Sequence, residues 1–533
     1  MLLHQMISLL EIRESIGNLN IEIRGLSPDS RTISRGWLFV AIQGESQDGR
    51  AFIREAVQRG AAAVVLDGDQ VEGFFSVKAD SVGNQPCGQT GEKGLEEFAA
   101  STGVAVILVE NARKALARLA CAFYNYPADK LRLIGVTGTK GKTTTTFMLK
   151  AILEQAGYKV GLVGSIAAYI GERQIAETDR TTPESIELQR LLAQMAEEKV
   201  EIAIIEVSSQ AMKMHRTEGC QFEVAVFTNF SKDHISPKEH ATMEEYFACK
   251  CKLLENAQKL VLNLDDERVA KVRELFTEKQ VLTYATEQGA DFFVPRESVR
   301  LNTKGTWFDL QLGSGTFEAL QGSGRSEIKF QEMFVSIPGM FSVYNALAAM
   351  TAASYFTVNL ENCRTALSHI TVLGRSELVP NDRGIAIMID YAHTPASLEC
   401  ILLAARQYVQ GRLICAWGVG GDRDKEKRPI MGEISGRLAD FTVLMSDQVR
   451  TEDPLSILKD IEVGVQKTGK PYTIIVDRTE GIRYALAMAK PGDMVLIPGL
   501  GHDTYLERNG VKYPYDERKV IAGILQEDYI KSQ

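Results

Sequence analysis

A glycine-rich segment between an apolar run and a threonine run has the residue types of a phosphate-binding loop. It reads GVTGTKGKTTTT over residues 135–146. A strand that enters such a turn just before a helix presents successive backbone N–H groups to an anion. The groups expected to surround the anion are those of Gly138, Thr139, Lys140 and Gly141. Lys142 would then reach the β- and γ-phosphates of a nucleotide, and the Thr143 hydroxyl would hold Mg²⁺.

The usual form of this loop has a further glycine five residues before Gly141, and this chain has Val136 in that place. A lysine-bearing turn between a strand and a helix, with no nucleotide, is therefore the less favoured alternative. The loop by itself does not distinguish a kinase, a GTPase, an ATPase or a ligase.

Three side chains downstream of the loop could complete a metal and phosphate site. Glu206 ends one apolar segment, His234 ends the next, and Lys250 lies in the helical segment TMEEYFACKCKLL. Carboxylate and imidazole groups at successive strand ends can ligate cations that bridge ATP phosphates. Taken singly, each of these residues is more often an ordinary surface or core residue. Their placement after the loop favours one shared site.

The elements that must position these residues are alternating strands and helices. Polar groups follow the apolar segments in EIAIIEVSS, VAVFTNFSKDH and KLVLNLDD. This pattern is typical of a parallel, doubly wound sheet with its site along the carboxyl edge. Residues 290–340 are predicted to form β-hairpins. The chain from about residue 373 is predicted to form a second α/β unit that has no phosphate loop.

The length of 533 residues suits roughly three domains, and the predicted fold class is α/β. The predicted domains are residues 1–111, 112–372 and 373–533. Residues 80–105 are rich in glycine and polar residues, which predicts an inserted loop in the region near 70–105 of the first domain.

Bulk composition limits the classes of partner and compartment. The net charge of −9, without a strongly basic stretch, disfavours nucleic acid as a partner. The sequence contains no run of about 18 apolar residues, so no membrane span is predicted. The N-terminal residues do not resemble an export signal. The eight cysteines are scattered and form no C-x-x-C, which favours reduced thiols in the cytoplasm. The sequence carries no signal for an oligomer, so a monomer is the simplest expectation.

Several motifs, taken in chain order, resemble those of the Mur ligase family. GTKGKTT at 138–144 matches the family's G-T-x-G-K-T-T, which lacks the earlier glycine, and SPDSRTISRGWLFVAIQG at 27–44 resembles its UDP-binding opening. The other matching segments are RTTPES at 180–185, EVSSQAMKMHR at 206–216, DYAHTP at 390–395, GVGGDRDKEKRP at 418–429 and GLGHD at 499–503. The resemblance covers nearly the whole chain, except the regions near 70–105 and 310–335.

This resemblance implies a three-domain fold with a central P-loop sheet and a C-terminal Rossmann-like domain. It implies an ATP-dependent ligase that adds the third amino acid of the peptidoglycan stem peptide to UDP-MurNAc-L-Ala-D-Glu. The carboxylate of D-glutamate would become an acyl phosphate, which the incoming amine would attack. The implied partners are therefore small molecules, with ATP and Mg²⁺ required.

The resemblance also assigns ligand contacts residue by residue. Those implied for the UDP substrate are Ser30, Glu45, Ser46, Gln47, Thr181, Thr182, Ser208 and Arg216. Those implied for ATP are Gly138, Thr139, Lys140, Gly141, Lys142, Thr143 and Thr144, with Asn345 at adenine, Asp390 at ribose and Arg375 near the phosphates. Those implied for the amino acid are Arg423, Asp447, Arg450, Gly499 and Asp503. Taken one at a time, several of these residues could have an ordinary structural role as a turn cap, a strand end or a solvated charge.

Lys250 falls where the family carries a carbamylated lysine, N6-carboxylysine. A neutral amine that adds CO₂ becomes an anionic carbamate, which can bridge magnesium ions where an ammonium would repel them. The implied metal ligands are Thr143, Glu206, His234 and Lys250 as its carbamate. The implied catalytic residues are Lys142, Lys250, His234 and Glu206.

The added amino acid is predicted from one short loop. The diaminopimelate form of the family has D-N-P-R, and this chain has Asp447-Gln448-Val449-Arg450. The arginine fork suits a distal carboxylate, and Asp503 suits a distal ammonium. We therefore expect a diamino acid, with meso-diaminopimelate slightly ahead of lysine or ornithine. The alternatives are a related ligase such as folylpolyglutamate synthase, or a P-loop switch or small-molecule kinase.

Overall fold

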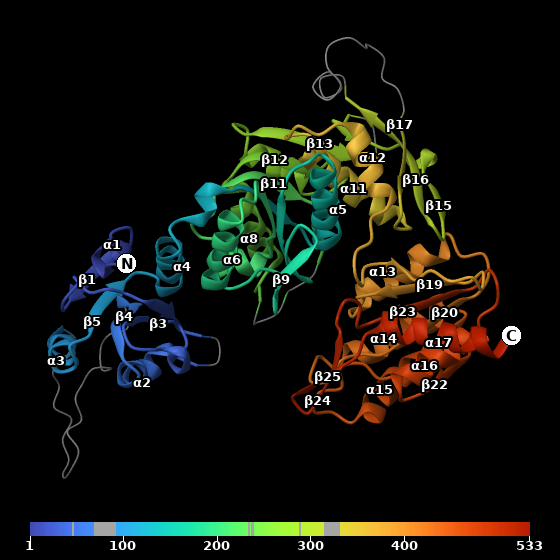
Figure 1. The fold of residues 1–533 in the computed structure, drawn as a ribbon. Helices are drawn as coiled ribbons and strands as arrows, with labels where there is room; N and C mark the ends of the chain where they lie inside the picture. The colour runs from blue at the N-terminus through green and yellow to red at the C-terminus, as the bar shows by residue number, and fades with distance from the viewer. Residues whose placement is uncertain are drawn as a thin grey trace. The chain divides into compact units, whose positions relative to one another are not determined.

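The computed structural model describes residues 1–44, 47–68, 92–232, 235, 239–286, 289–313 and 331–532. The helices and strands of the chain are drawn in Figure 1, and they divide into two compact units. The first unit consists of Met1–Lys142, Tyr158–Val261 and Arg268–Val281. The second unit consists of Thr143–Gly157, Leu262–Glu267 and Leu282–Gln533. Among the described residues, none of the helices has the length and apolar character needed to cross a membrane.

The first unit opens with a five-stranded sheet in the order β1-β5-β4-β3-β2. Its strands are β1 (Ile12–Ile16), β2 (Gly25–Ser27), β3 (Trp37–Ala41), β4 (Ala61–Asp67) and β5 (Ala105–Val109). Only the β1–β5 pair is antiparallel among these described strands. Alternate residues of β3 enter opposite cores because successive side chains of a strand point to opposite faces.

Helices cover both faces of this sheet. α1 (Leu3–Ile7) and α4 (Ala112–Phe123) pack on one face, and α2 (Ile53–Gln58) and α3 (Glu92–Thr102) pack on the other. Residues 92–102 were expected to be loop, and they form α3 instead, because Leu95 and Ala99 lie one turn apart and are both buried. The rest of the expected insert, residues 69–91, lies outside the described residues.

The phosphate loop follows β6 in the next sheet, whose strand order in the first unit is β12-β11-β6-β10-β7-β8-β9. These strands are β6 (Arg132–Thr137), β7 (Val160–Val163), β8 (Ala167–Ile170), β9 (Arg173–Glu177), β10 (Ile202–Glu206), β11 (Phe222–Phe227) and β12 (Ala257–Asn263). β6 is parallel to β10 and to β11, so the carboxyl ends of these three strands meet at one edge. The prediction of functional groups at the ends of parallel strands matches this arrangement.

The helices of this region are α5 (Lys142–Gln155), α6 (Ser185–Glu197), α7 (Ser209–Lys213), α8 (Met243–Glu255) and α9 (Val269–Leu275). α8 begins where the Thr242 hydroxyl accepts the Glu245 N–H, with Glu244 and Glu245 in its first turn. A hydroxyl cap and acidic residues both stabilise the start of a helix. α8 carries Lys250, so these local signals help to position that side chain.

The second unit contains the predicted hairpins. Its strands here are β13 (Gln280–Ala285), β14 (Phe292–Phe293), β15 (Arg300–Asn302), β16 (Gly305–Leu312) and β17 (Gln331–Val335). β16 pairs antiparallel with β14, β15 and β17, which confirms the hairpin prediction for the described residues. Helices α11 (Met340–Ala353) and α12 (Leu360–Ser368) follow.

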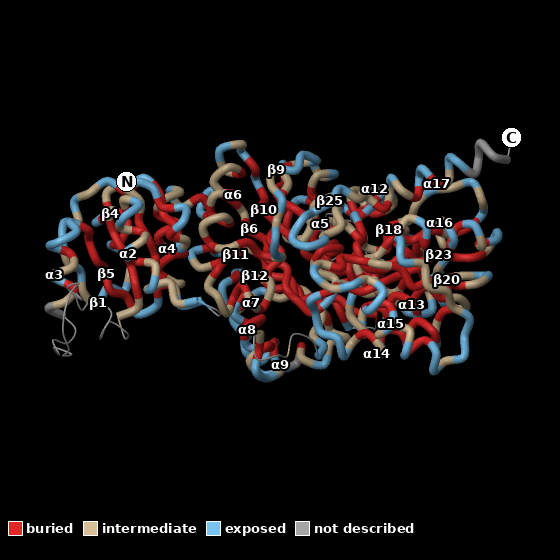
Figure 2. The backbone as a smooth tube through the Cα atoms, turned by 90° about the horizontal axis from the view of Figure 1, so that it is seen from below, coloured by how far each residue is buried: buried red, intermediate tan, exposed pale blue. Residues whose placement is uncertain are grey.

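The second unit ends in a six-stranded sheet with the order β18-β19-β23-β20-β21-β22. Its strands are β18 (Glu377–Leu378), β19 (Ala386–Asp390), β20 (Leu413–Trp417), β21 (Phe441–Leu444), β22 (Tyr472–Ile474) and β23 (Met494–Pro498). All of these pairs except β18–β19 are parallel, as predicted for a second α/β unit. Strands β20 and β23 are buried along their length (Figure 2).

Helices again cover both faces of this sheet. α13 (Pro395–Arg406), α14 (Lys427–Leu438) and α15 (Pro454–Gln466) share one core, and α16 (Arg478–Met488) and α17 (Glu517–Ser532) share the other. A hairpin of β24 (Tyr505–Arg508) and β25 (Val511–Pro514) follows β23. The predicted amino-acid contacts lie at the carboxyl ends of β21 and β23 and in the loops near them.

Candidate active site

The phosphate loop has a backbone shape that glycine makes possible. Gly138 has φ +143° and Gly141 has φ +83°, conformations that side chains other than glycine rarely adopt. A Cβ added at Gly138 would overlap the Thr228 hydroxyl. The loop therefore lies directly against the segment that follows β11, and Gly138 is required for that close approach.

This segment after β11 also holds the loop by hydrogen bonds. The Thr139 N–H donates to the Asn229 carbonyl at 2.8 Å, and the Lys140 N–H donates to the Asn229 side chain at 2.9 Å. The Thr228 hydroxyl donates to the Lys140 carbonyl at 2.7 Å. In this structure, two of the four N–H groups expected at an anion are bonded to Asn229. Asn229 was not among the predicted residues, although it follows a buried strand as the predicted ones do.

Lys142 begins α5, and its side chain turns back over the loop. Its Nζ donates to the Gly138 carbonyl at 3.0 Å and to the Thr139 carbonyl at 3.2 Å. Thr143 and Thr144 are both buried in the first turn of the helix. The sequence thus places an ammonium group and a hydroxyl group at the start of one helix, where an anion is also favoured by the helix dipole.

Lys250 lies in the same place although it is more than a hundred residues away in sequence. Its side chain is buried, and its Nζ donates to the Gly138 carbonyl at 2.7 Å. The Nζ also lies 4.5 Å from the centre of the Tyr246 ring, and the Tyr246 hydroxyl donates to the Thr139 hydroxyl at 3.2 Å. A charged amine is costly to bury without partners, so these contacts fix its position at the loop.

Glu206 ends β10 next to the phosphate loop strand. Its register partner on β6 is Val136, and its side chain is fully buried. One carboxylate oxygen accepts the Ser165 N–H at 3.0 Å, and the other accepts the Ser165 hydroxyl at 3.1 Å. A Cβ at Gly164 would overlap this carboxylate. Ser165 was missed in the sequence, although it follows the apolar strand β7 and so fits the same strand-end rule.

Four residues expected to contact the muramoyl peptide gather around Glu206. The Thr182 hydroxyl donates to the Glu206 carbonyl at 2.7 Å and accepts the Ser208 N–H at 3.1 Å. Arg216 donates to the Thr182 carbonyl at 3.2 Å, and the Thr181 hydroxyl accepts a hydrogen bond from Ser165 at 3.1 Å.

Arg216 is an unusual arginine because it is buried. It forms an ion pair with Glu184 at 3.0 Å, while its Nε has no hydrogen-bond partner among the described residues. Burial lowers the pKa of this guanidinium from its ordinary value. A buried donor without a partner is costly, and it suits a ligand that supplies an acceptor.

The other predicted UDP contacts belong to the N-terminal sheet region. Ser30 is buried, and its hydroxyl donates to the Glu55 carboxylate at 2.8 Å. Gln47 is exposed, and its carbonyl accepts the Gly44 N–H at 2.9 Å. Glu45 and Ser46 lie outside the described residues, as does His234 of the predicted metal set.

Three predicted ATP contacts lie in the second unit. Asn345 is buried on α11, and its side-chain oxygen accepts the Thr145 hydroxyl at 3.3 Å. Asp390 ends β19 and accepts the Ser376 N–H at 2.8 Å, and burial raises the pKa of its carboxyl. The Arg375 guanidinium lies over the Tyr391 ring, 4.8 Å from its centre.

The predicted amino-acid contacts are tied to residues that the sequence did not point to. Arg450 adopts φ +52°, and its Nη1 donates to the Gly421 carbonyl at 2.6 Å. Its Nε lies 3.3 Å from the Glu507 carboxylate. The Gln448 side chain donates to Asp503 at 3.3 Å and accepts the Glu507 N–H at 2.6 Å. Gln448 therefore contacts Asp503 directly and is linked to Arg450 through Glu507.

Asp447 and Gly499 meet at the carboxyl end of the sheet. Gly499 has φ +130°, and a Cβ there would overlap the Asp447 carboxylate. Asp447 also lies 3.4 Å from the buried Arg478 guanidinium, which pairs with the buried Glu517 at 2.7 Å. This internal ion pair fixes Asp447 in place. Arg423 is exposed on the loop before α14.

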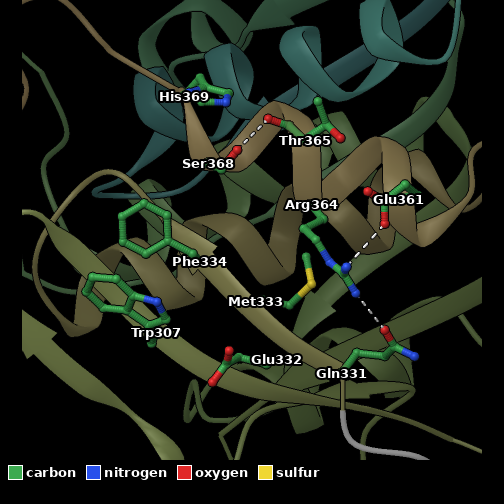
Figure 3. Close-up of a pocket in the computed structure, with 10 residues that line it drawn as sticks. All are labelled: Trp307, Gln331, Glu332, Met333, Phe334, Glu361, Arg364, Thr365, Ser368 and His369. Atoms are coloured by element: carbon green, nitrogen blue, oxygen red, sulfur yellow. Dashed lines mark hydrogen bonds and ion pairs between the residues drawn. The ribbon is translucent and has the colours of Figure 1, made fainter.

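A pocket of about 580 Å³ in the second unit lies apart from all these residues (Figure 3). The Trp307 and Phe334 rings lie 4.2 Å apart on one wall, and Arg364 of α12 contacts Glu361 and Gln331. No predicted site residue is among those that line it. The candidate active site is therefore defined by the phosphate loop and not by this cavity.

The fold and site define an α/β enzyme with a phosphate loop, a buried strand-end carboxylate and a buried lysine at that loop. Three family models match in chain order. "Mur ligase family, catalytic domain" covers 22–124, "Mur ligase middle domain" covers 136–353, and "Mur ligase, glutamate ligase domain" covers 374–501. The chain belongs to the Mur ligase family, a family of ATP-dependent ligases, which confirms the resemblance predicted from the sequence.

Individual relatives agree with this membership. A protein of Caldanaerobacter subterraneus subsp. tengcongensis named "UDP-N-acetylmuramoyl-L-alanyl-D-glutamate--2,6-diaminopimelate ligase" is 43% identical over 512 residues, 96% of each chain. A protein of Clostridium acetobutylicum with the same name followed by the number 1 is 37% identical, again over 96% of each chain. A solved structure of a ligase of that name aligns over 99% of both chains with a TM-score of 0.65 and 26% identity.

Proposed function

We propose that this chain is an ATP-dependent ligase that joins 2,6-diaminopimelate to the D-glutamyl carboxylate of UDP-MurNAc-L-Ala-D-Glu. The observation that carries the proposal is the convergence of Lys142 and Lys250 on the phosphate loop, with Glu206 at the end of the neighbouring strand. The relatives named for this reaction match nearly the whole chain. Because the chain belongs to the Mur ligase family, an unrelated P-loop switch or small-molecule kinase is excluded, and a related ligase is the alternative that is left.

The reaction needs an activated carboxylate because a carboxylate and an ammonium do not form an amide in water unaided. A carboxylate oxygen of D-glutamate attacks the γ-phosphorus of ATP, and ADP leaves. The neutral amine of the amino acid then attacks the acyl carbon, and phosphate leaves through a tetrahedral intermediate. Catalysis is mainly positioning and neutralisation of charge, as in other phosphoryl transfers.

The residues of the loop supply both of these contributions. Lys142 carries a positive charge to the start of α5, where the β- and γ-phosphates would lie. Thr182, Ser208 and Arg216 would orient the muramoyl peptide beside Glu206, and the bare Nε of Arg216 is a donor available to it. Asn345, Asp390 and Arg375 would hold the adenine, ribose and phosphate parts of ATP.

The residues present fit Mg²⁺. The buried Glu206 carboxylate and the Thr143 hydroxyl are hard oxygen donors of the kind that this ion prefers, and His234 is the proposed third ligand. When bound, the ion would neutralise charge on the transferred phosphoryl group. Glu206 is already oriented by hydrogen bonds from the Ser165 N–H and hydroxyl groups.

Lys250 fits the proposal of a carbamate. Its ammonium would lose one proton to become an amine, and the amine would lose a second proton as it adds CO₂ and forms an N–C bond, so that one negative charge replaces one positive charge. Its burial disfavours the charged ammonium form, and its contact with the Gly138 carbonyl brings the side-chain tip to the loop. The modified side chain would add carboxylate oxygens to the metal ligands.

The choice of diaminopimelate has two supports. The relatives carry that amino acid in their names, and Arg450 retains the planar fork that suits a distal carboxylate. Asp503 would meet the distal ammonium, with Asp447, Gly499 and Arg423 around the rest of the molecule. Lysine and ornithine remain the competing substrates.

The proposed domains are residues 1–111 for the UDP substrate, 112–372 for ATP and 373–533 for the amino acid. The family models, which match within or close to these limits, support the division. We place the enzyme in the cytoplasm as a monomer that binds only small molecules.

A phosphate-release assay tests the proposal. We expect ADP and phosphate only when ATP, Mg²⁺, UDP-MurNAc-L-Ala-D-Glu and diaminopimelate are all present. Equal release without the UDP substrate would contradict a ligase, and release that requires a folate substrate instead would favour folylpolyglutamate synthase.

A further inference from the structure

A second group of metal-ligating side chains lies beside Tyr246, whose ring Lys250 also contacts. The side-chain donor atoms of His240, Glu245 and Cys249 all lie within 4.8 Å of one another. His240 and Cys249 are buried, and Glu245 is partly exposed. We propose that these three side chains form a binding site for a divalent transition-metal ion of the zinc type, distinct from the proposed magnesium site.

The local fold brings the three donors together. Glu245 and Cys249 are four residues apart on α8, so they lie on one face of that helix. His240 precedes the helix, and the Thr242 cap turns the chain so that the imidazole packs beside the first turns. Tetrahedral zinc needs donors roughly 3.4–3.8 Å apart, so small side-chain rotations would close the site.

The imidazole of His240 provides an independent sign of a ligand. Its Nε2 lies 2.9 Å from the Ser209 hydroxyl, and its Nδ1 is buried without a hydrogen-bond partner among the described residues. When Nε2–H donates to Ser209, Nδ1 carries a free lone pair, as in many metal-binding histidines.

The donor set selects the kind of ion. A thiolate and an imidazole suit zinc-type ions, whereas Mg²⁺ prefers oxygen ligands alone. Binding would displace the thiol proton of Cys249 to solvent and form a metal–sulfur bond. Lys213 lies 2.7 Å from one oxygen of Glu245, and the other oxygen accepts the Ala241 N–H at 2.7 Å. A carboxylate has lone pairs beyond these two bonds, so Glu245 can still ligate an ion.

Tyr246 packs against both His240 of this site and Lys250 at the phosphate loop. Its ring centre lies 5.1 Å from the His240 ring and 4.5 Å from the Nζ of Lys250. Cys249 and Lys250 are consecutive on α8, so their side chains leave the helix about 100° apart. A bound ion would link the chain at His240 to α8 without occupying the position of Lys250.

Cobalt binding provides the test, because Co²⁺ bound to a thiolate absorbs in the near ultraviolet and strongly in the visible range. The full chain, without an affinity tag and treated with a chelator, is titrated with Co²⁺. We expect one equivalent to give the thiolate band, Zn²⁺ to abolish it and excess Mg²⁺ to leave it unchanged. Zn²⁺ should also raise the unfolding temperature, since it binds the folded state.

Matched variants decide which thiol is responsible. Cys249→Ser should lose the band and the thermal shift, while Cys251→Ser, which changes a buried cysteine of the same helix outside the group, should keep both. Glu245→Gln alters a partly exposed side chain and should weaken Co²⁺ binding at least tenfold even if Cys249→Ser fails to fold. No thiolate band in the wild type, a band retained in Cys249→Ser, or unchanged affinity in Glu245→Gln would overturn the proposal.

Discussion

The phosphate-loop region of the first unit and the amino-acid region of the second unit hold their predicted residues in different ways. At the loop, Lys142 and Lys250 both donate to the Gly138 carbonyl, and Glu206 is fixed by Ser165, which follows the neighbouring strand β7. In the amino-acid region, Arg450 and Asp503 are each bonded to side chains outside the predicted set, Glu507 and Gln448. The two lysines share one partner in the first region, whereas Arg450 and Asp503 are linked through other side chains in the second.

This difference in how the side chains are held predicts how each region responds to substitution. Residues that converge on one backbone carbonyl act as a unit, so the loss of one should disable the chemistry. Residues that act through intermediaries can be retuned by changing the intermediary, so substrate choice can vary on the same fold. We therefore expect large effects on rate from the first region and selective effects on substrate from the second.

Lys250→Ala should have the largest effect. We expect a loss on the order of 10³-fold or more in kcat, roughly 4 kcal/mol of transition-state stabilisation, because the proposed anionic carbamate near the γ-phosphate could not form. A short-chain carboxylic acid added to the variant should restore part of the rate. Lys252→Ala is the control, since Lys252 is exposed on the same helix. Near-wild-type activity of Lys250→Ala, with an inactive Lys252→Ala, would show that the roles of the two lysines are reversed.

Gly138→Ala should have the next largest effect. The added Cβ would overlap the Thr228 hydroxyl and displace the loop, so kcat/KM for ATP should fall by about 10²-fold, roughly 2.7 kcal/mol. Gly157→Ala is a matched control, because Gly157 has φ +94° but no atom within 4 Å of an added Cβ. It should lower the unfolding temperature and leave kcat/KM for ATP unchanged. Equal kinetic losses in both variants would mean that backbone strain, not the close approach, is responsible.

Arg450→Ala should discriminate between substrates. We expect kcat/KM to fall at least tenfold for diaminopimelate, about 1.4 kcal/mol, and to change little for lysine, because only diaminopimelate has the distal carboxylate. Glu507→Gln provides the opposing change, since it removes the anion that now pairs with Arg450 and should favour diaminopimelate further. If Arg450→Ala weakens both substrates equally, the arginine supports the loop through Gly421 and does not read the carboxylate.

Asp503→Asn should have the smallest effect, and it should appear in the pH dependence of kcat/KM. Burial raises the pKa of the Asp503 carboxyl above the ordinary value, so as the pH falls through that pKa the carboxylate gains a proton sooner than an exposed aspartate would. The attraction for a distal ammonium is then lost, and kcat/KM for diaminopimelate should fall on the acidic side and recover as the pH rises. Asp503→Asn should remove this acidic limb. An unchanged acidic limb in the variant would assign the titration to another group.

The sequence was most informative where chemistry follows local order. The glycine-rich loop, the apolar strand before it and the helix of Lys250 could each be read from short segments, and all three lie together as predicted. Helix α3 was missed, because the amphipathic residues 92–102 follow a long polar and glycine-rich stretch that suggested loop throughout.

Other contacts could not be read because they join distant segments. Asn229 bonds to the loop from about ninety residues away, and Gln448 bonds to Asp503 across 55 residues. Asn229 follows an apolar strand and Gln448 lies in the loop expected to read the amino acid, but neither residue type shows which distant segment its side chain contacts. Ser165 was accessible in principle, since it follows an apolar strand, but a serine after a strand is too common to single out.

An isotope measurement tests the central claim, that phosphate passes to a carboxylate at this loop. UDP-MurNAc-L-Ala-D-Glu labelled with ¹⁸O in its D-glutamyl carboxylate is converted with ATP, Mg²⁺ and diaminopimelate, and the released phosphate is analysed by mass spectrometry. The account predicts that one labelled oxygen moves from the carboxylate into each phosphate as the amide forms. Phosphate whose new oxygen comes from water, with the label kept in the unreacted carboxylate, would contradict it.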